Sequence, residues 1–290
     1  MPSPEEKQRE DSQEDFLSDS LQSLWGIAEI TRSSGGELFV FEHAESATVV
    51  TLRTPDTTAA NWRLHANSIW SASVFLAQHI RELHLDSYSP EGSVRVLELG
   101  AGAGLPGITI AKTYPDALVV VSDYPDPLLI DTLRENTETN GVSSRCFAAP
   151  YDWGTDSSHL LPAAHRDGPG NSSVFDVIIA ADTLWNSDFH PIFLRSLELT
   201  LRKSTSSRAH IIAGFHTGRY TLDAFLKMVE GKAGNALEIE KIEEKAVVGD
   251  AVREWSVQRA ETEAEEDRRG WLLWVTLRWR LDVSKLDSYT

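Results

Sequence analysis

The chain has 290 residues, of which 41% are hydrophobic, enough to bury one substantial core as a single α/β domain. Its 44 acidic and 27 basic residues give a formal charge of −17, which opposes nucleic acid as a partner because phosphate binding depends on Lys and Arg. The same acidity is a common solubility device, and it would also attract a basic protein or a cationic small molecule.

The N-terminal residues, 1–22, are polar, acidic and poor in aromatics, so we expect them to form a disordered tail. They lack both the apolar core of a secretory signal and an Arg-rich amphipathic pattern. No apolar run of the chain approaches the roughly 20 residues that span a bilayer. The single cysteine, Cys146, cannot form an internal disulfide and is expected to pack in a buried strand. These features predict a cytoplasmic protein with no membrane partner.

The remaining residues, 23–290, are expected to form one domain. A β-hairpin is expected at about 37–52, where two β-rich runs surround a polar centre. Apolar residues then recur near a 3.6-residue period over 67–83, which predicts an amphipathic helix. From residue 94 onward, apolar strands alternate with helices, and this alternation predicts a doubly wound, mostly parallel sheet that is covered on both faces.

The alternation yields these ranges: strands 94–99, 117–122, 145–149, 174–180, 209–215 and 237–243, and helices from about 106, at 127–139, at 189–201 and at about 221–230. The Gly-, Ser- and Pro-rich segment 154–173 interrupts the rhythm and is expected to be a loop insertion. The apolar run that begins at Trp271 is expected to be a last strand, reached by a hairpin.

The stretch VLELGAGAGLPG, residues 96–107, places glycines directly after an apolar strand, and two templates fit it. Residues 102–107 satisfy G-x-G-x-x-G, the dinucleotide fingerprint. The stretch also satisfies acid-x-G-x-G-x-G, with Glu98 as the acid, which suits a nucleoside without a diphosphate because a carboxylate there opposes an anion at the helix N-terminus. S-adenosylmethionine carries a sulfonium and an ammonium group, so nearby carboxylates favour it. The remaining alternative is a tight turn with no ligand.

Acidic and aromatic residues follow the next two strands. Asp123 ends the second strand, where a carboxylate can accept hydrogen bonds from both ribose hydroxyls. The alternative is a helix N-cap ahead of Pro125 or Pro127. Asp152 and Trp153 follow the third strand, where a carboxylate can meet the adenine amine while an indole covers the ring. The alternative is a buried Trp with a capping Asp.

A family resemblance covers about residues 60–280 and is carried by the motifs LHANSIWSAS, VLELGAGAGLPGI, VVSDYPD, YDW, IIAADTLWNSDFHPIFLRSL and IIAGFHTGR. The sequence resembles the seven-strand class I methyltransferases, and more narrowly the nicotinamide N-methyltransferase-like branch, which includes lysine and N-terminal protein methyltransferases. The resemblance implies a seven-stranded sheet with a C-terminal antiparallel strand, and S-adenosylmethionine as the cofactor. Where relatives often have Leu-Trp, this chain has Leu64 and His65, so the first aromatic of that motif is missing.

The resemblance also implies which residues contact the cofactor, and the charge argument adds Glu98 to them. The expected cofactor-binding residues are Trp70, Glu98, Gly100, Ala101, Gly102, Asp123, Trp153 and Ala181.

The segment that leaves the fourth strand, 180–186, reaches the edge where open α/β sheets bind ligands. A lysine amine with a pKa of about 10.4 is neutral in only about one molecule in 2,500 at pH 7, so the site must help it lose a proton. We expect Asp182 to orient the incoming ammonium group and Trp185 to wall the acceptor channel, as the D-x-x-aromatic motif of the resembled family implies. The alternatives are a helix cap for Asp182 and core packing for Trp185.

Two further residues, His216 and Arg219, follow the fifth strand and are expected at the same edge. His216 either relays a proton or is structural. No spacing of His, Cys or carboxylate residues predicts a metal site.

The sequence therefore predicts an S-adenosylmethionine-dependent N-methyltransferase that acts on a protein amine, either a lysine or an N-terminus. The resemblance adds a translation elongation factor, a basic protein, as a candidate acceptor. The nearest alternative acceptor is nicotinamide or another small nitrogen compound; a wide acceptor channel would favour the protein and a closed one the small molecule. An NAD-dependent oxidoreductase and a non-catalytic scaffold are alternatives from other classes.

Overall fold

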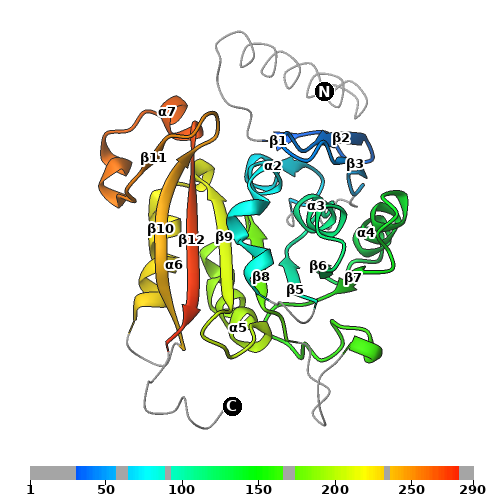
Figure 1. The fold of residues 1–290 in the computed structure, drawn as a ribbon. Coiled ribbons are helices and arrows are strands. Elements are labelled where there is room, and N and C mark those ends of the chain that lie inside the picture. The colour runs from blue at the N-terminus through cyan, green and yellow to red at the C-terminus, as the bar shows by residue number, and fades with distance from the viewer. Residues whose placement is uncertain (1–30, 57–64, 89–92, 166–173, 232–235, 281–290) are drawn as a thin grey trace, which may run out of the picture.

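The computed structural model describes residues 31–56, 65–88, 93–165, 174–231 and 236–280, and Figure 1 shows their arrangement. At the centre lies an eight-stranded sheet with the order β11-β10-β12-β9-β8-β5-β6-β7. Its strands are β5 Arg95–Leu99, β6 Leu118–Asp123, β7 Cys146–Pro150, β8 Val177–Ala181, β9 Arg208–Gly214, β10 Leu237–Ala246, β11 Val252–Arg253 and β12 Trp271–Trp279. Strands β5 to β9 pair in parallel, and β12 lies antiparallel between β9 and β10. The predicted doubly wound sheet is confirmed, and β11 adds a short edge strand to it.

Helices cover both faces of this sheet, and the central strands are therefore buried at nearly every position. One face packs against α2 (Ser71–Gln78), α3 (Leu105–Thr113) and α4 (Pro127–Thr139), and the other against α5 (His190–Thr200) and α6 (Arg219–Glu230). Strand β5 illustrates the division, since Val96 belongs to the first core and Leu97 to the second. Within the described ranges, none of the helices combines the length and apolarity needed to cross a membrane.

The expected N-terminal hairpin is present as β2 (Leu38–Glu42) and β3 (Val49–Arg53). Its inward side chains, Phe41, Val50 and Leu52, belong to the same core as α3 and α4. The hairpin therefore sits on the helices that follow the first two strands of the sheet, as Figure 1 shows in blue beside α3 and α4.

The expected helix over 67–83 is wrong in its extent. Ile69–Trp70 form a short strand, β4, which pairs with β1 (Thr31–Arg32), and the α-helix covers only α2. The helix ends at His79, whose N–H contacts both the Phe75 and Leu76 carbonyls, and a 3₁₀ turn follows. Pairing with a distant strand overrides the local periodicity at the start of this segment.

The connections between elements match the expectations where they are described. Residues 154–165 of the expected loop insertion contain only the 3₁₀ turn Ala163–His165, while 166–173 and the expected tail, 1–22, lie outside the described residues. The last strand is reached from β10 through residues 247–270, which contain β11, a 3₁₀ turn (Val257–Glu261) and α7 (Glu265–Arg269). Cys146 is buried in β7, and this burial raises the pKa of its thiol.

Candidate active site

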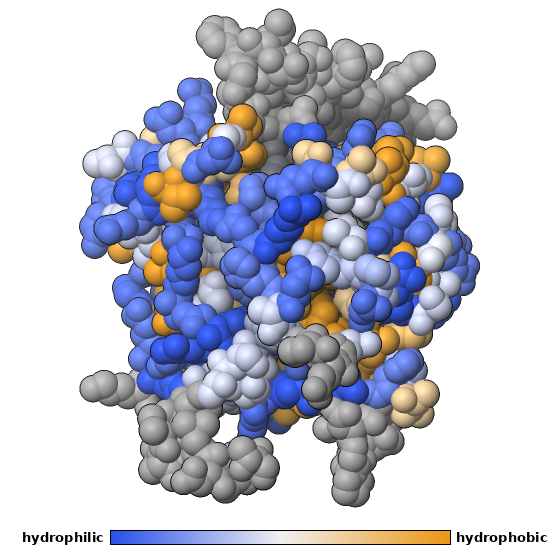
Figure 2. All heavy atoms as spheres, in the orientation of Figure 1, coloured by the Kyte–Doolittle hydropathy of each residue, from blue (hydrophilic) through white to orange (hydrophobic). Residues whose placement is uncertain are grey.

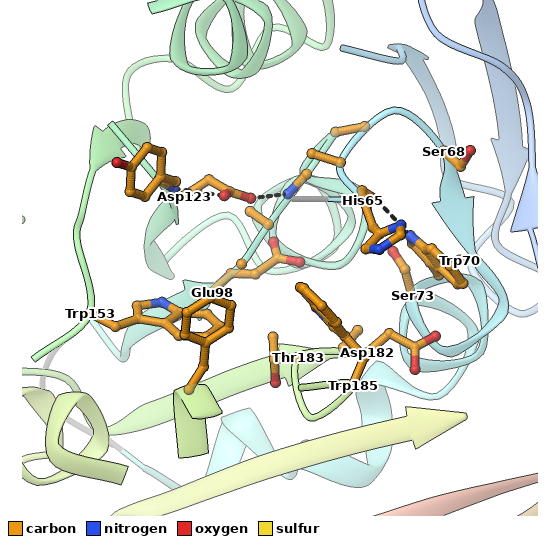
Figure 3. Close-up of a pocket in the computed structure, with 18 of the residues that line it drawn as sticks. His65, Ser68, Trp70, Ser73, Glu98, Asp123, Trp153, Asp182, Thr183 and Trp185 are labelled. Carbon is orange, nitrogen blue, oxygen red and sulfur yellow. Dashed lines mark hydrogen bonds between the residues drawn. The ribbon is translucent and has the colours of Figure 1, made fainter. Parts of the chain in front are cut away.

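A cavity of about 320 Å³ opens at the carboxyl ends of β5 and β8, where the strand order reverses. All ten residues predicted from the sequence to bind cofactor or to act in catalysis line it: Trp70, Glu98, Gly100, Ala101, Gly102, Asp123, Trp153, Ala181, Asp182 and Trp185. In Figure 3, Trp153, Glu98 and Asp123 lie on one side, which we name the glycine-loop side. Asp182, Trp70 and His65 lie on the other, which we name the acceptor side. The roles of these residues stay predictions.

The glycine loop, residues 100–104, turns sharply between β5 and α3. Gly100 and Gly102 have φ angles of +66° and +54°, a conformation that favours glycine. A Cβ on Gly100 would also lie 2.8 Å from the methyl carbon of Thr183 and 3.4 Å from the Trp153 ring. The loop therefore packs so closely against the cavity wall that position 100 has no room for a side chain.

Glu98 anchors the start of α3. Its Oε2 accepts a hydrogen bond from the Gly107 N–H at 2.9 Å, and a Cβ on Gly107 would lie 2.6 Å from that oxygen. Burial raises the pKa of Glu98 to about 8, although the Gly107 hydrogen bond lowers it. The carboxyl group is therefore mostly neutral at pH 7 until a cation binds beside it.

The same contact bears on the dinucleotide alternative. A helix N-terminus binds a phosphate through free N–H groups of its first turn. In the first turn of α3, the Gly107 N–H is bound to Glu98, and Pro106 has no N–H to donate. Two of the positions in the first turn of α3 thus have no free N–H for a diphosphate, which favours the acid-x-G-x-G-x-G interpretation.

Asp123 faces the glycine loop from the end of β6. Its carboxylate accepts hydrogen bonds from the N–H groups of Gly102 and Tyr124, both at 2.7 Å. Burial raises its pKa to about 6, and the two hydrogen bonds lower it. The N-cap of α4 is Asp126, which accepts from the Leu129 N–H, so the N-cap alternative for Asp123 is wrong.

Trp153 forms the opposite wall of the glycine-loop side. Its half-buried ring packs against Phe193 with centroids 4.9 Å apart and lies against Gly100. Asp152, which is exposed, lines the cavity next to it. An indole face and an adjacent carboxylate at this place suit the adenine ring and its amine, as the sequence predicts.

Asp182 is held by the end of β9. Its Oδ1 accepts the Gly214 N–H at 2.8 Å, and its own N–H donates to the Ile212 carbonyl. The residue has a φ of +58°, a left-handed conformation that is uncommon for a non-glycine residue and typical of functional sites. Its side chain is 6% exposed, and this burial raises its pKa. Since α5 begins only at His190, the helix-cap alternative for Asp182 is wrong.

Four rings, those of His65, Trp70, Trp185 and His216, line the acceptor side of the cavity together with Asp182. Trp70 and His216 stack with centroids 4.9 Å apart, and His65 meets the edge of Trp185 at 4.9 Å. The Trp70 indole donates to the His65 carbonyl, and His216 Nδ1 lies 3.9 Å from Asp182 Oδ1. His65 therefore supplies a ring at the motif position where the first aromatic is missing. Trp185 faces the cavity (Figure 3) and is not buried in the core, so that alternative is wrong as well.

Arg219 does not reach the cavity, although the sequence places it at the same edge. Its guanidinium is fully buried between Glu244 and Glu263, with nearest N–O distances of 2.6 and 2.7 Å. The rings of Phe215 and Trp255 lie over it at 4.1 and 5.4 Å. Its place in the fold is structural, and of the two residues after β9 only His216 lines the cavity.

Sequence reasoning missed several cavity-lining residues, among them Ser68, Ser73, Tyr124, Thr183, Phe189, Ile192 and Thr217. Tyr124 and Thr183 stand inside motifs that the sequence singles out, so their position in SDYPD and ADTLW was an available signal. Phe189 and Ile192 come from the start of α5, and no local pattern indicates that this helix turn borders the cavity.

The residues of the glycine-loop side fit S-adenosylmethionine. Asp123 offers a carboxylate for ribose hydroxyls, Trp153 an aromatic face for the base, and Glu98 a carboxyl group whose ionised form is favoured by a cation. The first turn of α3, with the Gly107 N–H bound to Glu98 and no N–H on Pro106, is a poor site for a diphosphate. The chemistry of the donor set therefore matches a cationic nucleoside.

The chain is similar to several curated proteins. The chain is 32% identical over 155 residues to the protein N-terminal and lysine N-methyltransferase efm7 of Schizosaccharomyces pombe, which covers 53% of this chain and 57% of that protein. The protein of the same name from Aspergillus fumigatus is 33% identical over 153 residues, with 51% and 56% covered. The chain thus spans just over half the length of these curated relatives.

Among solved structures, TrmN from Thermus thermophilus aligns with a TM-score of 0.43 and 19% identity, covering 74% of this chain and 49% of that one. The family described as lysine methyltransferase matches residues 58–232, which include the glycine loop, Asp123, Trp153 and the 180–186 segment. The methyl donor that this family implies is S-adenosylmethionine. With more than half of its residues matched, the chain belongs to the lysine methyltransferase family.

Proposed function

We propose that this protein transfers the methyl group of S-adenosylmethionine to an amine of a protein, either a lysine side chain or an N-terminus. The observation that carries the proposal is the position of Asp182, a buried carboxylate that is held by Gly214 and lines the acceptor side with Trp70, Trp185 and His216. The names of the relatives, protein N-terminal and lysine N-methyltransferase, support the same acceptor class.

The chain's residues align and desolvate the acceptor. When bound, the cofactor supplies an electrophilic methyl group, so catalysis depends on an unprotonated amine held in line with it. One oxygen of Asp182 is held by the Gly214 N–H, which fixes the carboxylate in place. An entering ammonium group would bind this carboxylate, lose a proton to water, and present its lone pair. Trp185 and Trp70 would exclude water from the alkyl chain behind the amine.

Access to the acceptor side favours a protein acceptor over nicotinamide. Exposed residues rim the acceptor side: His65 and Phe189 both meet the Trp185 ring, and Phe189 is 37% exposed. A small-molecule enzyme gains from a closed cavity that surrounds its ligand. An apolar, aromatic rim that stays open to solvent suits a peptide segment, whose side chain enters while its backbone remains outside.

An NAD-dependent oxidoreductase is a weaker candidate for this site. The G-x-G-x-x-G match would require the N-terminus of α3 to bind a diphosphate, and Glu98 already binds the Gly107 N–H there. The acidic net charge of −17 further opposes an anionic ligand and favours a basic acceptor protein. A translation elongation factor is one such protein, and it stays the candidate that the family resemblance suggests.

The test incubates the purified protein with methyl-labelled S-adenosylmethionine and a whole-cell lysate, and locates the label by mass spectrometry. We expect label on an amine of a protein band; label only on a small metabolite would overturn the acceptor class. The Asp182→Asn variant should bind S-adenosylhomocysteine as the wild type does but turn over at least about 100-fold more slowly. Asp188→Asn, an exposed acid outside the cavity, is the matched control and should keep full activity.

A further inference from the structure

Asn136 of α4 and Asn140, the C-cap residue of the same helix, bind the hairpin as a neighbouring strand would. The Asn136 side chain accepts the Arg53 N–H at 2.8 Å and donates to the Arg53 carbonyl at 2.9 Å. Asn140 repeats the pattern with the N–H and carbonyl of Thr51, at 3.0 and 2.7 Å. A helix rises about 6 Å over four residues, close to the roughly 6.7 Å that a strand covers over two. The spacing of the two side-chain amides along the helix therefore matches the spacing of the Thr51 and Arg53 backbone groups along β3.

The two asparagines differ in the use of the second amide hydrogen. The second amide hydrogen of Asn140 donates to the Asn136 carbonyl, one turn earlier in the chain, at 2.8 Å. The second amide hydrogen of Asn136 instead donates to the carbonyl of Ala103, in the glycine loop, at 2.9 Å. Asn136 is 2% exposed, and its three hydrogen bonds use both amide hydrogens and the amide oxygen. No other side chain of this size offers two donors and one acceptor in that arrangement.

Ala103 occupies a decisive place in the glycine loop. It follows Gly102, whose N–H binds Asp123, and precedes Gly104, whose N–H closes a turn onto the Ala101 carbonyl. The Ala103 carbonyl and the Gly104 N–H belong to one planar peptide unit, so the Asn136 bond and the Gly104 bond hold the same unit of the loop from two sides. The orientation of this peptide unit, and with it the path of the glycine loop along the cavity, then depends on Asn136.

We propose that Asn136 is a positioning residue that couples the N-terminal hairpin to the cofactor-binding glycine loop. The inference rests on the proposed function of that loop. The hairpin lies before residues 58–232, which match the family, so the coupling joins the cofactor loop of the matched region to an element outside it. Arg53 holds the amide of Asn136, and the amide holds the carbonyl of Ala103. Because coupling between two sites is reciprocal, cofactor bound at the loop stabilises the pairing of the hairpin.

The first test uses the wild-type protein and amide hydrogen exchange with and without S-adenosylhomocysteine. The reporter is the Arg53 N–H, which lies outside the cavity and is bound to Asn136. We expect its exchange to slow at least about threefold when the ligand binds, since ligand that orders the loop also orders the groups bound to it. Unchanged exchange at Arg53, with ligand bound at saturation, would overturn the coupling.

The second test compares Asn136→Ala with Asn140→Ala, which loses the hydrogen bonds to Thr51 but keeps the bond from Asn136 to Ala103. Both should lower the melting temperature. Only Asn136→Ala should weaken S-adenosylhomocysteine binding, by about tenfold, while kcat at saturating cofactor is retained. Equal affinities of the two variants would refute the proposal. A wild-type protein that binds no S-adenosylhomocysteine would instead refute the proposed function, and if Asn136→Ala does not fold, the wild-type exchange measurement decides.

Discussion

Glu98 is deeply buried and lies beside the proposed cofactor site. Burial raises its pKa from 4.5 to about 8 in the folded protein, so its contribution to folding stability is complete below pH 4.5 and is lost as the pH rises through about 8. A bound cation favours the ionised carboxylate and lowers this pKa. Cofactor binding near neutral pH is therefore expected to release a proton from Glu98.

This linkage is measurable by calorimetry. Between about pH 6.5 and 7.5, the Kd for S-adenosylmethionine should fall by about fivefold to tenfold, because one pKa unit corresponds to a tenfold change. The binding heat should also depend on the ionisation enthalpy of the buffer. Glu98→Gln keeps an acceptor for the Gly107 N–H and should make the affinity independent of pH in this window. The same proton release in both proteins would exclude Glu98 as its source.

Position 214 has no room for a side chain larger than that of glycine. Its φ of −74° is open to any residue, but a Cβ would lie 2.8 Å from His216 Nδ1 and 3.3 Å from Asp182 Oδ1. Gly214→Ala should displace the carboxylate and lower kcat by about 100-fold, with S-adenosylhomocysteine affinity unchanged, because a misplacement of about 1 Å has this effect.

The double variant Gly214→Ala with His216→Ala removes the closer of the two clashes, the one between the new Cβ and the His216 ring. It should recover part of the lost kcat if displacement of the side chains is the cause. A single variant with wild-type turnover would show that the position of Asp182 does not limit the reaction.

At the scale of elements, a buried ion cluster fastens residues 247–270 to the start of α6. Arg219 and Arg253 share the carboxylates of Glu244 and Glu263, and Arg259 adds a third cation at Glu244, 2.8 Å away. Burial raises the pKa of Glu244, but its hydrogen bonds and ion pairs with Arg219 and Arg253 outweigh this, so the net shift is downward. The stability that the cluster contributes is therefore complete above the ordinary pKa of 4.5 and is lost as the pH falls through the lower folded value.

Arg219→Met is expected to leave two buried carboxylates short of a cation and to lower the free energy of unfolding by about 3 kcal/mol at pH 7. The acid-induced loss of stability below about pH 4.5 should also become smaller than in the wild type. Chemical denaturation at several pH values measures both. Arg278→Met, which breaks a half-exposed pair with Glu238, is the control and should leave the unfolding midpoint almost unchanged. Equal effects of the two substitutions would contradict a structural role for the cluster.

At the scale of the whole molecule, charge rather than apolar surface characterises the exterior. Figure 2 shows that hydrophilic residues cover most of the visible face, and the chain carries a net charge of −17. Such a surface attracts a basic acceptor protein over distances comparable to the Debye length, which is about 10 Å at 0.1 M salt.

The attraction predicts a salt effect that is confined to the acceptor. Raising the salt from about 50 mM to about 500 mM should increase the KM for a basic acceptor protein severalfold, because charges are then screened within a few ångströms. The KM for S-adenosylmethionine should change little, since it depends on buried groups. A neutral peptide that carries the same acceptor residue is the control. A KM for the basic acceptor that does not vary with salt would argue against electrostatic recognition.

Sequence alone determined the sheet and part of the cavity lining. Apolar strands such as β5 and β6 are recognisable because burial on both faces leaves few polar positions, and parallel strands bring their carboxyl ends to one edge. Glu98, Asp123, Trp153 and Asp182 could therefore be assigned to one cavity from their places after successive strands.

Only the tertiary structure decided what these residues bind within the protein. Local periodicity could not reveal that Trp70 pairs with β1, that Arg219 turns away from the cavity, or that Asn136 joins the hairpin to the glycine loop. These contacts link residues far apart in the chain, and their energies depend on distance and burial, which no short sequence window contains. The types of side chain in the site could thus be predicted from the sequence. The groups that hold those side chains in place could be identified only in the folded structure.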